Sequence, residues 1–219
     1  MNNVIKMIKF DISLIKPYCK SLLLIFLVLL IFIISTTQDI ISGVIFCMSI
    51  MAMTSSYTFS IAEKNDLNRL YGLLPVTKKD IVTGRYMFSA LTGIVAVLSG
   101  VVMNIAVLIF TKKSFSYEDI VIAVSVGLTL FTLFTAIQLP GFFKFGAIKG
   151  RFITFIPFLG MFLVGVLTKG INPENFQKFP DIAVLNNVSA FFAISILLDI
   201  VIYGISMGIT QKLYDRMEL

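Results

Sequence analysis

Long apolar runs are the feature that most constrains this chain, because a water-soluble fold has no place for so many of them. Apolar residues fill 58% of the 219 positions and charged residues 14%, whereas soluble domains are about 45–50% apolar and about 25% charged. A helix that crosses a bilayer needs about 20 mostly apolar residues. The runs therefore predict an all-α, polytopic integral membrane protein that forms one domain over residues 1–219. Its six expected transmembrane helices are Ser21–Thr36, Ile40–Ala62, Tyr86–Phe110, Ile120–Phe143, Phe152–Leu167 and Val188–Thr210.

The distribution of positive charge predicts how these helices are oriented. Six spans place both termini on one side, and 14 of the 18 Lys and Arg residues then fall on that side. Because loops on the cytoplasmic side of a membrane carry the excess of Lys and Arg, we expect both termini in the cytoplasm. The net charge of +6 is then explained by topology, with the lipid bilayer as partner and no nucleic acid. The four basic residues on the other side are Lys112, Lys113, Lys169 and Lys178.

Two segments outside the expected spans have patterns of their own. In residues 1–18 an apolar face lies mostly opposite three lysines, which is typical of a helix in the headgroup layer. Residues 168–187 contain Pro173 and Pro180 and are expected to form an external loop. The apolar face of the first segment consists of Val4, Ile5, Ile8, Ile12 and Ile15.

The composition argues against chemistry in this chain. It contains no His, which removes the usual general base and the commonest metal ligand. Cys19 and Cys47 form no CxxC site, and "GAIKGR" lacks the spacing of a P-loop. We therefore expect no enzymatic activity, no catalytic residue, and no metal or cofactor site in this chain.

Polar residues inside the expected spans are the candidate pathway residues. Asp199 is the acid near the middle of a span, a position that is costly and functional by default, although a hydrogen bond to Asn104 or Tyr203 would explain it structurally. The small residues of the second and third spans fit close helix packing. Those of the second span could instead line a path for an amphipathic substrate beside adaptable Met side chains. We favour the structural explanation for both sets. The candidate residues are Ser49, Met53, Ser56, Asn104 and Asp199.

The segment 63–85 concentrates charge between two apolar runs and has a helical pattern. Apolar residues at positions 67, 70, 71 and 74 follow i, i+3, i+4, i+7, which predicts a short amphipathic helix from Glu63 to Leu73. Pro75 ends it, and Thr77-Lys78-Lys79-Asp80 is typical of a capping box that begins the helix leading into the third span. The apolar stripe could lie on the bilayer or fill a groove on a cytoplasmic partner.

Two stretches resemble a known family of membrane proteins. "EKNDLNRLYGLLPVTKKDIVTGRY", residues 63–86, is similar to the intracellular segment of ABC-2-type permeases, and "LPGFFKFGAIKGR", residues 139–151, is similar to a second connection in that family. Length and expected topology resemble its compact bacterial subfamily, including the membrane subunits of phenol-soluble modulin exporters.

This resemblance implies a function and partners. It implies a permease subunit of an ATP-driven exporter of amphipathic or hydrophobic peptides, such as peptide toxins, in the bacterial cell membrane. A separate ATPase subunit would bind ATP and Mg, and a second membrane chain, identical or closely related, would complete the transporter. The implied coupling residues are Glu63, Asp66, Leu67, Arg69, Leu70, Tyr71, Leu74, Pro75, Thr77 and Lys78, and the implied dimer contact is Phe155, Leu159, Phe162 and Val166.

Two other functions stay open at this stage. A secondary transporter or channel would need ion-coupling acids or broken helices in matching positions, and Asp199 alone is thin support for it. An immunity or sensory membrane protein that transports nothing could share the same ATPase, so the sequence hardly separates it from an exporter.

Overall fold

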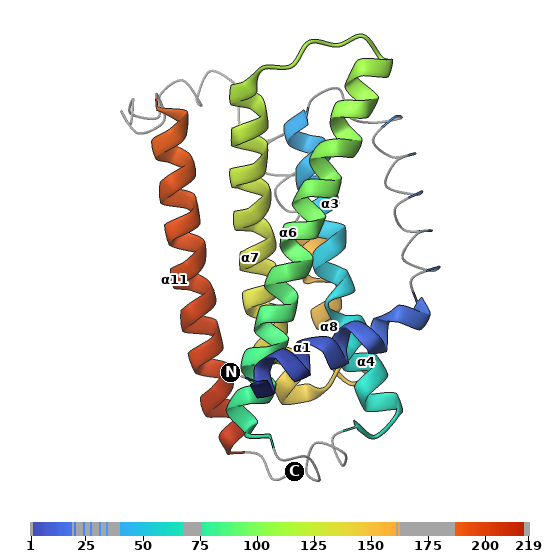
Figure 1. The fold of residues 1–219 in the computed structure, drawn as a ribbon, viewed down its shortest axis with the longest axis vertical. Coiled ribbons are helices and arrows are strands. Elements are labelled where there is room, and N and C mark those ends of the chain that lie inside the picture. Colours follow the sequence, from blue (N-terminus) through green and yellow to red (C-terminus); the bar gives the residue numbers. More distant parts are fainter. Residues whose placement is uncertain are drawn as a thin grey trace.

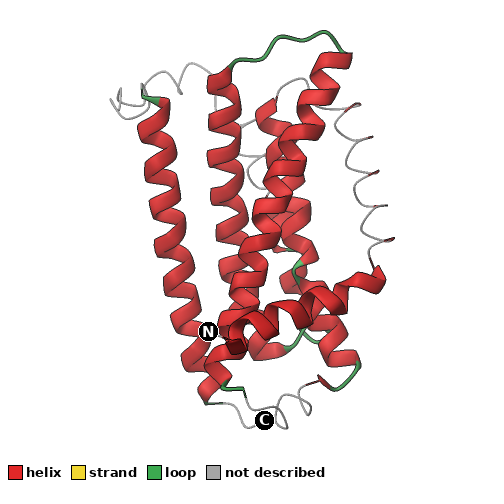
Figure 2. Ribbon diagram, in the orientation of Figure 1, coloured by secondary structure: helices red, strands yellow, loops and turns green. Residues whose placement is uncertain are grey.

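The computed structural model describes residues 2–18, 20, 24, 27, 31, 34, 40–67, 76–160, 162 and 187–216. Within these residues every regular element is a helix, as Figure 2 shows. The predicted all-α class is therefore confirmed for this part of the chain. The helices are α1 (Asn2–Ile15), the short 3₁₀ helix η1 (Lys16–Tyr18), α3 (Ile40–Thr54), α4 (Ser56–Lys64), α6 (Lys78–Phe110), α7 (Tyr117–Phe145), α8 (Arg151–Thr154) and α11 (Val188–Asp215).

Four described helices are long and apolar enough to cross a membrane. They correspond to the predicted second, third, fourth and sixth spans. The predicted first span lies mostly outside the described residues and the fifth lies partly outside them, so the six-span topology stays a prediction. The loop 168–187 also lies outside them, except for Asn187. The four helices are Ile40–Lys64, Lys78–Phe110, Tyr117–Phe145 and Val188–Asp215.

α6 begins eight residues before the predicted third span. Its 33 residues correspond to a length of about 50 Å, well beyond the ~30 Å hydrocarbon layer. The first two turns of α6 are polar, so the length of the apolar run did not predict them as part of this helix. The local signal for the start was Thr77, whose side chain accepts a hydrogen bond from the Asp80 amide while the Asp80 carboxylate accepts one from the Thr77 amide. The predicted capping box is confirmed.

The second span is broken at Ser55, between α3 and α4. Three consecutive hydroxyl residues bond back to their own helix: Thr54 to the Met51 carbonyl, Ser55 to the Ala52 carbonyl and Ser56 to the Met53 carbonyl. Such bonds compete with the backbone ladder and bend helices. Residues Ile40–Lys64 still form one candidate span, and Ser55 keeps helical dihedral angles, so the predicted second span is found with a one-residue interruption.

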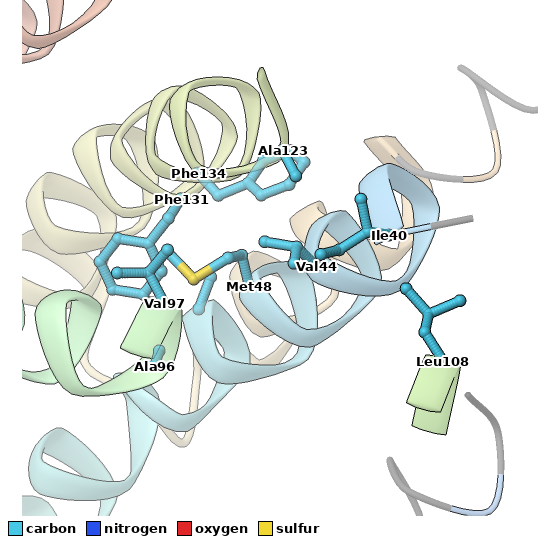
Figure 3. Packing of buried hydrophobic residues seen from close by; sticks show 10 residues of the cluster. Ile40, Val44, Met48, Ala96, Val97, Leu108, Ala123, Phe131 and Phe134 are labelled. Atoms are coloured by element: carbon cyan, nitrogen blue, oxygen red, sulfur yellow. The ribbon is translucent and has the colours of Figure 1, made fainter. Parts of the chain in front are cut away.

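The main core lies where α3, α6 and α7 meet. Figure 3 shows Met48 of α3 among side chains of α6 and α7. Met48 is fully buried, as are Val44 and Ala52 on the same face of α3. These three residues recur four apart and so form one stripe along the helix. The cluster comprises Ile40, Val44, Met48, Ala52, Ala96, Val97, Leu108, Ala123, Phe131 and Phe134.

Glycines let these helices approach one another closely. A Cβ on Gly43 of α3 would overlap the side chain of Asn104 on α6, and a Cβ on Gly93 would lie 2.6 Å from the Phe131 ring of α7. Asn104 is 2% exposed, and its amide donates to the Gly100 carbonyl one turn before it in α6. This arrangement favours the interpretation that the small residues allow close helix packing.

We expect Gly43→Ala to destabilise the bundle by about 1–3 kcal/mol, because the added methyl group forces Asn104 to move in a packed interface. Adding Asn104→Ala should recover part of the loss, since the smaller side chain leaves room for that methyl group. Thermal unfolding in detergent measures both. Gly204→Ala is the matched control, because a Cβ there meets nothing within 4 Å; equal effects at Gly43 and Gly204 would contradict the packing argument.

Candidate functional site

One end of the bundle gathers the segments that the sequence analysis singled out. The end of α4, the start of α6, the end of α7, α8 and the end of α11 lie at this end, with α1 running across it (Figure 1). We call it the α1 end. It carries most of the described Lys and Arg residues, whereas the opposite end has Lys112 and Lys113 in the turn after α6. This grouping follows the charge asymmetry from which the cytoplasmic side was predicted.

The predicted coupling helix starts differently in the structure. Glu63 and Lys64 are the last residues of α4, and Asp66 adopts a left-handed backbone conformation with φ 49°, which interrupts the helix. Leu67 is half-buried against a cluster that contains Met7 and Ile81. The helix predicted to begin at Glu63 is therefore wrong at its beginning. The predicted coupling residues Arg69, Leu70, Tyr71, Leu74 and Pro75 lie outside the described residues.

Glu63 has a structural partner that the sequence did not reveal. Its Oε2 accepts a 2.8 Å hydrogen bond from the Ile148 amide in the loop between α7 and α8. Gly146 in this loop has φ 75°, and a Cβ on it would lie 2.8 Å from the same carboxylate. Glu63 thus joins the two stretches that carry the family resemblance. No local pattern signals this contact, because the partners are 85 residues apart.

α1 is held against α6 by a buried ion pair. Arg85 Nη1 lies 3.3 Å from Asp11 Oδ1, and the two side chains are 3% and 0% exposed. The Arg85 guanidinium also lies over the Phe59 ring, 4.7 Å from its centroid. One turn away Met7 is 2% exposed and packs where a Cβ on Gly84 would collide with it. These contacts join α1 to both α4 and α6.

Helices α1 and η1 form over most of the predicted segment 1–18, and their position in the headgroup layer stays a prediction. α1 also has a second face. Ile5 and Ile12 of the predicted apolar face are 41% and 52% exposed, as expected for a face toward lipid. The face that packs on the protein is the adjoining one, with Met7 and Asp11. An aspartate on an amphipathic helix has the pattern of a solvated residue, so the sequence did not indicate that Asp11 is buried.

Burial raises the pKa of Asp11 to about 6, and the nearby Arg85 guanidinium only partly offsets this. Removing a carboxylate from water costs more than the attraction returns. The pair therefore fixes the position of α1 rather than contributing net stability.

Tyr86, which follows Arg85, joins α6 to α11. Its hydroxyl lies 2.7 Å from the hydroxyls of both Ser206 and Thr210, and Tyr203 donates to the Tyr86 carbonyl at 3.0 Å. Ser206 in turn donates to the Ala136 carbonyl of α7. The start of α6 is thus bonded to three other helices: α1, α11 and, through Ser206, α7.

Two predicted coupling residues at the start of α6 also have partners within the chain. Thr77 forms the capping box with Asp80. Lys78 Nζ donates to the Asp215 carbonyl at 3.3 Å, where it meets the negative end of the α11 dipole. Asp66, another predicted coupling residue at this end, is exposed in the turn after α4.

The candidate pathway residues do not gather into one site. The Ser49 hydroxyl bonds back to the Ile45 carbonyl within α3, and the Ser56 hydroxyl at the start of α4 bonds back to the Met53 carbonyl of α3. Met53 itself is half-buried. Asn104 packs against Gly43. These contacts give each residue a role in packing.

Asp199 has a different neighbour from the two expected. Thr129 of α7 lies beside its carboxyl group, while the described bonds of Asn104 and Tyr203 run to Gly100 and Tyr86. Among the described residues, neither Asp199 Oδ1 nor the Thr129 hydroxyl has a hydrogen-bond partner, so the role of Asp199 stays a prediction.

The predicted dimer contact lies on the outside of the described bundle. Phe155, Leu159 and Phe162 are 51%, 60% and 68% exposed, and Val166 lies outside the described residues. Such a face suits lipid as well as a second chain, so the dimer contact stays a prediction.

The comparisons with known proteins identify a family. A family model described as "ABC-2 family transporter protein" matches residues 6–215, which include most of α1 and all four long helices. No curated protein and no solved structure matches the chain.

We expect Asp11→Ala to release α1, because it leaves the buried Arg85 charge unpaired at a cost of about 3–5 kcal/mol. The double variant Asp11→Leu with Arg85→Met should restore docking, since an apolar pair of similar size removes the charge altogether. Alkylation of Met7→Cys in a background without Cys19 and Cys47 measures the release. The alkylation rate of the cysteine at position 7 should rise about 100-fold or more when Asp11→Ala is introduced alone. A rate unaffected by Asp11→Ala would show that apolar contacts alone hold α1.

The raised pKa of Asp11 predicts a pH dependence with a defined sign. The folded carboxyl has a pKa of about 6 against an ordinary value of 3.8, so between these values the folded state binds more protons than the unfolded state. Stability should therefore fall as the pH rises through this window and level off above it. Going from about pH 7.5 to about pH 5 should stabilise the parent by about 1.4 kcal/mol relative to Asp11→Asn, measured by thermal unfolding of both. Parallel pH profiles would rule out a raised pKa.

Proposed function

Because this chain belongs to the ABC-2 transporter family, we propose that it is the membrane-spanning permease subunit of an ATP-driven exporter. The observation that carries the proposal is the family match over residues 6–215. ATP and Mg would be bound by a separate ATPase subunit. The proposed orientation places the α1 end in the cytoplasm of a bacterial cell, where that subunit would bind.

The surroundings of segment 65–77 support this segment as the ATPase contact. On one side Glu63 is bonded to the loop after α7, and on the other the capping box fixes the first turn of α6. A displacement of the segment would reach α6 directly, since both ends are held by defined bonds. From α6 it would reach α1 through Asp11–Arg85 and α11 through Tyr86.

The remaining features of the proposed transporter rest on the resemblance of the two cytoplasmic stretches to their counterparts in the family. We propose a second membrane chain packed against the exposed face of Phe155, Leu159 and Phe162. We propose amphipathic or hydrophobic peptides as the substrate class. Purified transporter in proteoliposomes tests both: ATP-dependent transport of such a peptide supports them, and a single membrane chain in the active complex contradicts the dimer.

The direct test is co-purification with the ATPase encoded beside this chain, followed by ATP hydrolysis and peptide transport in proteoliposomes. Transport that follows an ion gradient without ATP would favour a secondary transporter. Complex formation and hydrolysis with no transport of any peptide would favour an immunity or sensory role.

We expect Tyr71→Ala with Leu74→Ala to abolish co-purification with the ATPase or to uncouple hydrolysis from transport. Aromatic and aliphatic residues buried in a partner's pocket supply most of the binding energy of an interface. The matched control is Phe110→Ala with Tyr117→Ala, which removes two residues that are 87% and 78% exposed at the opposite end. The control should bind and couple normally. Normal binding and coupling in the Tyr71/Leu74 variant would instead place the stripe on the bilayer.

A further inference from the structure

A cavity of about 340 Å³ lies at the α1 end, between α1 with η1, the α3–α4 break and the first half of α6. It is separate from segment 65–77, and the proposed transport does not use it. On α6 its lining runs from Arg85 to Val95, ten residues or about 15 Å along the helix. The opposite wall runs from Met51 to Phe59. The cavity is therefore elongated along the helices, from the level of α1 toward the middle of the bundle.

The two ends of this cavity differ in charge. Its described lining contains two cationic side chains, Lys16 and Arg85, and no carboxylate. Both cations lie at the α1 end, whereas the far end is formed by residues such as Met51 and Val95. Arg85 is already engaged with Asp11 and Phe59. Lys16 is exposed, so it is the cation that can meet an anionic group at the mouth, beside the Tyr18 ring.

The exposure of the lining residues indicates where an occupant enters the cavity. Ile12 and Val95, which line it, are 52% and 59% exposed, so the cavity opens sideways to the surrounding lipid.

We propose that this cavity binds one acyl chain of an anionic phospholipid from the leaflet on which α1 lies. The phosphate lies at Lys16 and Tyr18, and the chain lies against Phe88 and Val95. Basic pockets between transmembrane helices are established sites for anionic headgroups. The bound chain fills the space between α1 and α6 and so supports the docking of α1 beside the Asp11–Arg85 pair.

The test uses the full-length protein in nanodiscs with phosphatidylglycerol that carries a diazirine on one acyl chain. Val95→Trp fills the cavity and should reduce labelling of the segments around Met51 and Phe88 at least tenfold. Leu98→Trp is the matched control, since Leu98 lies on the same helix, is 62% exposed and does not line the cavity. Thr92→Phe fills the same space one turn earlier and replaces Val95→Trp if that variant does not assemble.

A second arm tests the headgroup. Competition between phosphatidylglycerol and phosphatidylcholine for the labelled site should show a preference for the anionic lipid that falls about fivefold in Lys16→Gln. Lys9→Gln, an exposed lysine of α1 outside the cavity, should keep that preference. The proposal is overturned if Val95→Trp and Leu98→Trp label equally, or if the two lipids compete equally in the parent protein. It is also overturned if a photoreactive amphipathic peptide, and not the lipid, labels these segments.

Discussion

The buried pair of Asp11 and Arg85 is the interaction on which the α1 end depends. Both side chains are almost fully buried, and the raised pKa of Asp11 shows that its carboxylate loses more from burial than it gains from Arg85. A pair of this kind adds little net stability, but each partner without the other is costly. It therefore specifies one position of α1 on α6. The interfacial helix, which lipid alone would leave free to slide, becomes part of the bundle.

The first turns of α6 connect this pair to the rest of the molecule. Arg85 contacts α1 and α4, and the adjacent Tyr86 bonds to α11. On α11 the buried residues are Ser206, Thr210 and Tyr214, all in the half at the α1 end. Polar bonds thus concentrate at one end of the bundle. A movement imposed at the start of α6 reaches three other helices through directional hydrogen bonds and an ion pair, which transmit orientation better than apolar contacts do.

The sequence predicted those parts of the structure that local patterns encode. The Thr77–Asp80 capping box and a helix over most of residues 1–18 follow from residues within four positions of one another or from helical periodicity. The break at Ser55 also had a local signal, since Thr54, Ser55 and Ser56 stand in a row, but the apolar run around them concealed it. No local pattern in the sequence predicted the partners of Asp11 and Glu63. Each is an acid whose role is fixed by a residue far away along the chain, which only the packing of helices brings near.

The contact of Glu63 with Ile148 changes how the two resembling stretches relate to each other. Each reads in the sequence as a separate connection between spans. In the structure the Glu63 carboxylate, in the last turn of α4, accepts a hydrogen bond from the loop after α7, and Gly146 leaves space for this carboxylate. An ATPase that bound the segment 65–77 would therefore act on a unit made of both connections, rather than on a single loop. Because α7 also bonds to α8 and to the α3–α4 break through Gln138, this unit extends to the position where the second span is broken. This position lies beside the cavity proposed to hold lipid, since Ser55 both lines that cavity and bonds to Gln138.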